Sequence, residues 1–204
     1  MRVLIVGTDL NGPHDLKTQG QFLRDLLYEN SIDVSITSKY RNPVLRIFDT
    51  IYQILCLRKN DVVIVQVYST RGIYLEVLSG LLGKLKRCKV INTLHGGNIP
   101  HVYRTDKMKR TLLNMMFRTG HAITAPGNYI PSHIPSIQNN YLLIRNHIDL
   151  NHYRNERKPH DCIRIFWMRS YHPTYDPLKA LLIFEYIRNQ GIEAKLIMAG
   201  KDFG

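Results

Sequence analysis

A histidine followed by two glycines ends one of the apolar runs of this chain. The run Lys89–Leu94 leads into His95, Gly96 and Gly97 within the stretch VINTLHGGNIP. An imidazole can donate or accept a hydrogen bond at neutral pH, and glycines let a loop pass close to a ligand. Two interpretations follow: either His95 contacts a substrate at the edge of a cleft, or the glycines turn the chain and His95 ends a strand.

Other polar residues stand where loops commonly bind ligands. Asp9 and Asn11 lie in the long loop after the first apolar run, although turn formation alone also explains them. Arg169 follows a later apolar run, where it either binds a phosphate or lies on the surface. Asn146 and Asp149 are typical of side chains that bond the backbone of a turn. The remaining histidines show no metal-ligand spacing, so we expect no metal site.

Alternating strand and helix patterns position these residues. Apolar runs typical of strands occupy 2–6, 33–37, 61–68, 89–94, 121–127 and 141–149. Helical spacing of apolar residues occupies 21–30, 43–59, 72–86 and 106–120. Such alternation predicts a parallel sheet covered by helices on both faces. Ligands of such sheets bind beyond the carboxyl ends of the strands, so the expected site is formed by the loops after Val6, Val67, Leu94 and Ile144.

The pattern starts again after a polar, charged segment. Residues 151–161 predict a linker between a first domain, 1–150, and a second, 162–204. The second domain would contain one strand, one helix and one further strand, and such a unit cannot bury both faces of its strands. We therefore expect a chain that is incomplete: a fragment, or the front part of an interrupted gene.

Composition and charge narrow the class of protein. The 204 residues are 44% apolar and carry a net charge of +12, which favours phosphorylated ligands, nucleic acid or an acidic lipid surface without choosing among them. Basic residues cluster at 84–89 and 107–110, either as solvated helix ends or as a patch facing lipid or phosphate. The chain has no apolar run of about 20 residues, so the sequence predicts no membrane-spanning helix. The three widely spaced cysteines fit a reducing cytoplasm.

Four stretches of the chain occur in an order that matches one known family. They are VLIVGTDLNGPHDLKTQGQFLRDLL, NTLHGG, LLIRNHIDLNHY and IRIFWMRSYHPTYDPLKALLIFEYI. Together they resemble the retaining, nucleotide-sugar-dependent glycosyltransferases of family 4, which have the two-domain GT-B fold. The resemblance implies a Rossmann-like, acceptor-side domain over 1–150 and the first strand–helix–strand of a Rossmann-like, nucleotide-sugar-binding domain over 162–204. The family's Glu-x7-Glu motif, which holds the donor sugar and ribose, would lie beyond residue 204.

The resemblance also implies roles for the residues singled out above. Gly20 would let backbone approach the donor diphosphate, and Arg169 would contact its phosphates. His95 would face the donor sugar and the reacting centre, with Gly96 and Gly97 leaving it room. Asp9 and Asn11 would lie on the acceptor side, whereas Asn146 and Asp149 would hold the end of the first domain.

The chain departs from the family pattern at several of these positions. Gln19 stands where the family has the first of two glycines, and His147 replaces another glycine. Met168 replaces the glycine before Arg169, and no lysine follows in the loop SYHPTYDP. Either the phosphate site is weaker than the family's, or Tyr175 or His172 takes part of the missing lysine's role.

The expected function is sugar transfer from a nucleotide-sugar donor to a polysaccharide, glycolipid or other cell-surface glycan acceptor. We expect no cofactor, no metal and no nucleic-acid partner, and weak or absent activity of this chain alone. Its charge would suit a cytoplasmic enzyme, peripheral at the inner face of an anionic membrane. The alternative is a non-enzymatic Rossmann-like module that binds nucleic acid or phosphate, although no recognition-helix signature supports it. A nicotinamide dehydrogenase is disfavoured because the first loop lacks Gly-x-Gly-x-x-Gly.

Overall fold

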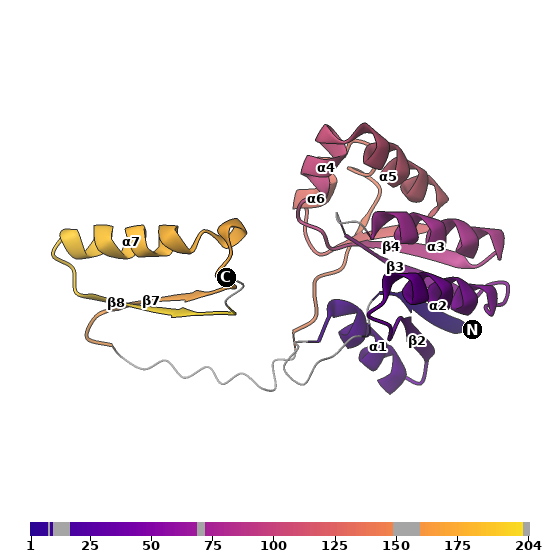
Figure 1. Cartoon of the computed structure of the whole chain (residues 1–204), viewed down its shortest axis with the longest axis horizontal. Helices are drawn as coiled ribbons and strands as arrows, with labels where there is room; N and C mark the ends of the chain where they lie inside the picture. Colours follow the sequence, from indigo (N-terminus) through magenta and orange to yellow (C-terminus); the bar gives the residue numbers. More distant parts are fainter. Residues whose placement is uncertain (8, 10–16, 69–71, 149–159, 202–204) are drawn as a thin grey trace. The chain divides into compact units, whose positions relative to one another are not determined.

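The computed structural model describes residues 1–204 apart from 8, 10–16, 69–71, 149–159 and 202–204 (Figure 1). The chain divides into two compact units, Met1–Ile148 and Asp149–Gly204. We describe each unit by itself. Most of the predicted linker, 151–159, lies outside the described residues.

The first unit is built on a six-stranded parallel sheet, so the predicted Rossmann-like α/β fold is confirmed for this part of the chain. The strand order is β2-β1-β3-β4-β5-β6. The direction in which successive strands are added reverses between β1 and β3, and ligands of open parallel sheets bind at such a switch point. The strands are β1 (Arg2–Val6), β2 (Asp33–Thr37), β3 (Val62–Val67), β4 (Lys89–Leu94), β5 (Ala122–Ala125) and β6 (Leu142–Leu143).

Alternate residues of each central strand pack on opposite faces of this sheet. Ile5 of β1 lies beside Ile36 of β2 and Ile64 of β3, and these side chains form a cluster with Leu23 and Leu27 of α1. The intervening residues of β1 and β3 join a larger cluster on the other face, which also takes in side chains of α2, α3 and α5. The helices are α1 (Gln19–Glu29), α2 (Pro43–Leu55), α3 (Ile73–Leu85), α4 (Ile99–Thr105), α5 (Lys107–Thr119) and α6 (Tyr129–Ser132).

Local sequence explains where the main helices begin. Thr18 and Gln21 form a capping box at α1: the Thr18 hydroxyl accepts the Gln21 N–H at 3.3 Å, and Gln21 Oε1 accepts the Thr18 N–H at 2.7 Å. Asn42 caps α2 ahead of Pro43, and Asp106 caps α5. The expected helices at these places are therefore confirmed, whereas the short helices α4 and α6 were not predicted.

The last strand of the sheet is shorter than its apolar run. The run 141–149 predicted a full strand, but only Leu142 and Leu143 pair with β5, and Ile144 adds one hydrogen bond to the carbonyl of Ala125. The neighbouring strand itself ends at Ala125, so the residues after Ile144 have no backbone to pair with. Residues 145–148 therefore leave the sheet and are free to line a site.

The second unit contains two parallel strands and one helix: β7 (Ile163–Met168), β8 (Ala194–Ala199) and α7 (Pro177–Asn189). A short 3-10 turn, η2 (Pro173–Tyr175), precedes α7, and Asp176 caps that helix. That this unit begins a nucleotide-sugar-binding domain stays a prediction. None of the helices in the described ranges of the chain is both long and apolar enough to cross a membrane.

Candidate functional site

A cavity of about 370 Å³ opens at the carboxyl ends of β3 and β4, on the face of the sheet that α1 covers. This is the place where the sequence predicted a site. Residues from three regions meet in it: the start of α1, the ends of the two central strands and the segment that leaves the sheet after β6. The lining residues are Gln19, Leu23, Leu26, Gln66, Thr93, His95 and 144–148.

His95 lines this cavity, and one nitrogen of its ring has no hydrogen-bond partner among the described residues. The amides of His95 and Gly96 both donate to the carbonyl of Val67, at 2.9 and 3.2 Å, so the end of β4 is fixed to the end of β3. Nε2 of His95 is buried and makes no hydrogen bond among the described residues. Burial lowers the pKa of His95 below its usual value, so the ring is neutral at pH 7 and offers one donor and one acceptor.

The His95 ring stacks on Tyr68, whose backbone N–H is hydrogen-bonded to the buried carboxyl of Glu76. The rings of His95 and Tyr68 stack with centroids 5.7 Å apart. The Tyr68 N–H donates to Oε1 of Glu76 at 3.2 Å. Glu76 lies in the first turn of α3 with 7% of its surface exposed, and burial raises its pKa to about 8. The carboxyl that contacts Tyr68, that of Glu76, is therefore protonated at pH 7.

Two residues of this site were missed in the sequence. Gln66 is 4% exposed, and its Oε1 has no hydrogen-bond partner among the described residues. The sequence feature that could have identified Gln66 is a side-chain amide in the otherwise apolar strand VVIVQV. The signal of Glu76 was a carboxyl in the apolar helix start IYLEV. Buried polar groups are normally hydrogen-bonded, so both residues could have been singled out as site candidates.

The start of α1 is tied to the segment after β6. Nε2 of Gln19 donates to the His147 carbonyl at 3.3 Å, and the His147 N–H donates to Oε1 of Gln19 at 3.0 Å. The His147 ring also packs against Phe22, with centroids 5.5 Å apart. Gln19 and His147 are two of the positions at which the chain departs from the family pattern, and they contact each other. The two departures thus form one interaction.

Gly20 follows Gln19 in α1 and faces the sheet. A Cβ built at Gly20 would lie 3.2 Å from Cδ1 of Ile36 and 3.6 Å from Ile5 and Gln66 side-chain atoms. The glycine therefore lets α1 approach β1 and β2 closely, a use of glycine known from dinucleotide-binding folds. The backbone N–H of Gln21 donates to Thr18. An anion at this helix end would therefore accept hydrogen bonds from the backbone N–H groups of Gln19 and Gly20.

The residues predicted to close the first domain are brought to the cavity in part. Asn146 and Arg145 both line it together with His95. Asp149 lies outside the described residues. Gly97 is exposed, with open space around its Cα, whereas Gly96 is buried where the turn begins. The structure therefore brings His95 and Asn146 to one cavity, whereas Gly20 is buried beside Gln19 and is not a lining residue.

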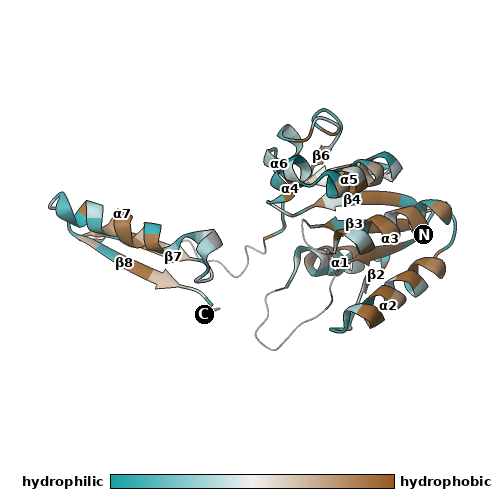
Figure 2. Ribbon diagram, turned by 45° about the horizontal axis from the view of Figure 1, so that its top comes forward, coloured by the Kyte–Doolittle hydropathy of each residue, from teal (hydrophilic) through white to brown (hydrophobic). Residues whose placement is uncertain are grey.

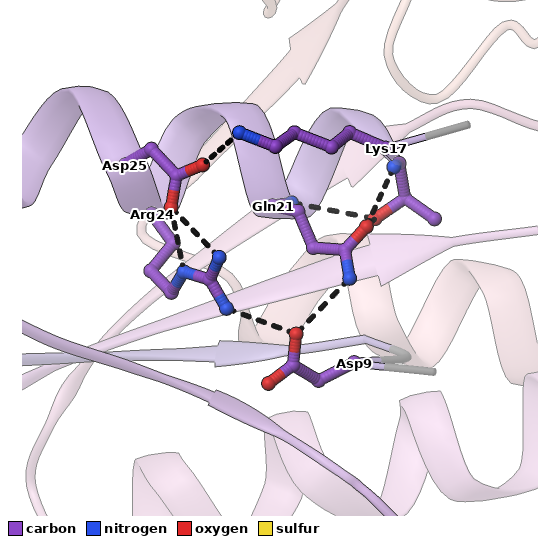
Figure 3. A network of polar contacts seen from close by, with 6 residues as sticks. Asp9, Lys17, Gln21, Arg24 and Asp25 are labelled. Carbon is purple, nitrogen blue, oxygen red and sulfur yellow. Dashed lines mark hydrogen bonds and ion pairs between the residues drawn. The ribbon is translucent and has the colours of Figure 1, made fainter. Parts of the chain in front are cut away.

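Asp9 belongs to a polar network on the same unit (Figure 3). Oδ1 of Asp9 accepts from Nη1 of Arg24 at 2.9 Å and from Nε2 of Gln21 at 3.0 Å. Arg24 also pairs with Asp25, which pairs with Lys17. Asp9 precedes segment 10–16 and Lys17 follows it, so the network fixes both ends of this loop to α1. Asn11 lies outside the described residues, and Oδ1 of Asp9 accepts hydrogen bonds from side chains of α1.

Arg169 follows β7 in the second unit. Its guanidinium carbon lies 5.3 Å from the centroid of the Tyr175 ring, and His172 meets the same ring edge-on at 6.4 Å. A Cβ at Gly200 would overlap the Arg169 carbonyl, so the chain needs a glycine directly after β8. The structure thus gathers the three residues that the sequence named for a phosphate contact.

The spacing Glu-x7-Glu also occurs within the second unit, at Glu185 and Glu193, whereas the family's own motif is expected beyond residue 204. Glu193 lies before β8, at the amino end of the two strands, whereas Arg169 follows β7 at the carboxyl end. Glu193 therefore lies at the opposite end of the two strands from Arg169.

No group of three or more His, Cys, Asp or Glu within the described ranges is arranged to hold a metal ion. Comparisons of the chain with models of protein families and with curated proteins give no match. The resemblance to family 4 glycosyltransferases therefore rests on the four stretches of sequence and stays a prediction.

Proposed function

We propose that this chain belongs to a glycosyltransferase that moves a sugar from a nucleotide-sugar donor to a glycan or lipid-linked acceptor. The observation that carries the proposal is the cavity at the carboxyl ends of β3 and β4, where a neutral His95 lies with Gln66, Thr93 and Asn146. Nε2 of His95 makes no hydrogen bond to any residue that the structure describes. Sugars are bound by such neutral donors and acceptors, because each hydroxyl needs both. The four stretches that resemble family 4 add the reaction class.

The chemistry requires three events at the reacting centre. The bond between the anomeric carbon and the diphosphate oxygen breaks, the anomeric carbon bonds the acceptor oxygen, and the acceptor proton leaves with the diphosphate. A neutral imidazole stabilises the transition state by hydrogen bonding to the sugar, and it does not repel the positive charge that develops on the sugar. His95 meets this requirement because burial keeps it uncharged at pH 7.

The departing diphosphate requires positive charge. Arg169 is the cation that we assign to it, with Tyr175 and His172 beside it. Guanidinium groups bind phosphate in bidentate geometry. Because one cation replaces the family's two, we expect weak donor binding.

Trp167 provides a direct test of this assignment. It is the single tryptophan of the chain, it lies in β7 two residues before Arg169, and its ring packs 5.1 Å from that of Tyr171. Titration with UDP and GDP should therefore change its fluorescence. Arg169→Gln should weaken the binding about tenfold or more, since a hydrogen bond to a charged group is lost. Arg188→Gln, which removes an exposed cation from the last turn of α7, is the matched control.

The first unit is tested by sugar binding. Saturation-transfer NMR with a panel of nucleotide sugars and glycan acceptors should show contacts that His95→Ala removes and that His101→Ala, an exposed histidine of α4, keeps. Absence of any nucleotide or sugar binding, together with tight and salt-sensitive binding to DNA, would replace this proposal with the non-enzymatic alternative.

A further inference from the structure

Helix α2 exposes an apolar face that the core of the first unit does not use. Only Thr50 and Ile54 of this helix are fully buried. Phe48 is 66% exposed and Tyr52 68%. The helix is brown over most of its length in Figure 2. The remaining large exposed side chains on it are Val44, Leu45, Ile47 and Leu55.

The exposed apolar residues form a continuous surface along the helix. Positions 44, 48, 52 and 55 follow one another at helical spacing, whereas the polar residues Arg46, Asp49 and Gln53 share one flank. Scattered single apolar residues are normal on protein surfaces, but a contiguous stripe of this kind marks a contact with a partner. Helix α3, which packs beside α2, adds exposed Tyr74, Leu78 and Leu85.

Basic side chains surround this apolar surface. Residues 39–59 carry five cations, Lys39, Arg41, Arg46, Arg58 and Lys59, and one acid, Asp49. Asp49 accepts two hydrogen bonds from Gln53 at 3.0 Å, so its charge is partly satisfied within the helix.

A second group of cations joins the carboxyl-terminal end of α2. The Asn60 N–H donates to the Arg87 carbonyl at 3.1 Å, and Sγ of Cys88 contacts the Arg58 carbonyl at 3.4 Å. These contacts place the basic end of α3 and the loop after it, with Lys84, Lys86 and Arg87, beside Arg58 and Lys59. No salt bridge joins any of these cations to a described residue.

We infer that α2 and the adjoining loops form a docking surface for an anionic lipid bilayer. An apolar helix face with cations at its borders is the arrangement by which helices lie in a membrane interface. Each nearby Lys or Arg adds attraction to acidic headgroups, and Tyr40 and Tyr52 suit the interfacial depth. A second copy of the chain fits less well, because a two-fold contact would bring the same cations together.

Vesicle binding tests this surface. The whole chain should sediment with vesicles of equimolar phosphatidylglycerol and phosphatidylcholine, and far less with pure phosphatidylcholine. Phe48→Glu should lower the partition coefficient about tenfold or more, because a large apolar side chain is lost from the lipid. Met108→Glu is the control, since Met108 of α5 is also well exposed, at 56%. Equal binding by these two variants, or no binding by the unaltered chain, would overturn the inference.

Charge and depth give two independent readouts. Replacing Lys59 and Arg87 by Gln should weaken binding about fivefold for each cation, whereas replacing Lys107 and Arg110 should change it less. In a Trp167→Phe background, Phe48→Trp should be quenched by lipids brominated on their acyl chains, and Met108→Trp should not. Sedimentation of the lipid-free chain covers the other occupants: a dimer that Phe48→Glu dissociates, with no lipid binding, would assign α2 to a second copy and reject the bilayer.

Discussion

β3 of the first unit and β7 of the second are six-residue parallel strands that are both mostly apolar, VVIVQV and IRIFWM, yet their surroundings differ. Every residue of β3 is buried. In β7 none is buried, and Phe166 is 60% exposed. The cause is the number of neighbours: β3 has a strand on each side and helices over both faces, whereas β7 has β8 alone and α7 on one face.

The comparison shows what an apolar run does and does not establish. It establishes that a segment can be a strand, because β-branched and aromatic residues fit the pleated backbone. It does not establish burial, which depends on elements far away in sequence. The same holds for helices: α3 buries six residues between β-strands and neighbouring helices, whereas α7 buries Ala180 alone.

The largest expected difference between the units is in the cost of core truncation. Ile5→Ala removes a fully buried side chain that lies between Ile36 and Ile64, and should lower the free energy of unfolding by about 2–5 kcal/mol. Ile197→Ala, at a half-exposed position in β8, should cost less than about 1 kcal/mol. Urea unfolding followed by circular dichroism, and by Trp167 fluorescence for the second unit, measures both.

Equal losses in the two variants would mean that the second unit is covered in solution. Coincident transitions by both probes would mean that the units unfold together, and either result would break the comparison.

A smaller effect on the free energy of unfolding should come from Glu76, the carboxyl that is buried in the first unit. The pKa of Glu76 is raised from 4.5 to about 8 by burial, so the folded state keeps a proton that the unfolded state releases between these values. Stability is therefore fully present below about pH 4.5 and falls as pH rises to about 8. Glu76→Gln removes this dependence, and above about pH 8 it should be more stable than the unaltered chain by about 2–4 kcal/mol.

Thermal unfolding across this pH range provides the measurement. Glu185→Gln, at an exposed position on α7, controls for the loss of one negative charge. If Glu76→Gln and the unaltered chain lost stability in parallel between these pH values, Glu76 would not be buried as described.

The smallest effect should separate two glycines within the first unit. Gly20→Ala places a methyl group 3.2 Å from Ile36, so we expect a loss of about 1–3 kcal/mol from overpacking. Gly97→Ala meets no atom within 4 Å and should change stability by less than about 0.5 kcal/mol. Guanidinium unfolding measures both, and a neutral Gly20→Ala would show that α1 does not need its close approach to β1.

Much of the fold could be predicted because it depends on local pattern. The strands around Ile5, Ile64 and Val90 and the helices capped by Thr18, Asn42 and Asp106 carry their signals within a few residues. The short α4 was missed because its seven residues, beginning with Ile99 and Pro100, are too few to show a period. The strand expected after Tyr141 was too long because its length depends on where β5 ends.

The candidate site could be predicted only in part. His95, Gly20 and Asn146 were named from their positions after strands or at a helix start. Gln66 and Glu76 were not, although an amide in the apolar strand VVIVQV and a carboxyl in the apolar helix start IYLEV mark them in the sequence. That each has a buried atom without a hydrogen-bond partner among the described residues shows only in the folded structure. The pairing of Gln19 with His147 joins residues far apart in sequence, so it could not be foreseen from either one.

By itself the sequence determined the parallel α/β architecture of the first unit and the edge of the sheet at which a site would lie, because strand alternation and helix spacing are periodic and local. Only the tertiary structure decided which residues meet in the cavity, that burial lowers the pKa of His95, and that α2 leaves an apolar face outside the core. The physical reason is the same in each case: burial and exposure are set by neighbours that the chain brings together only on folding.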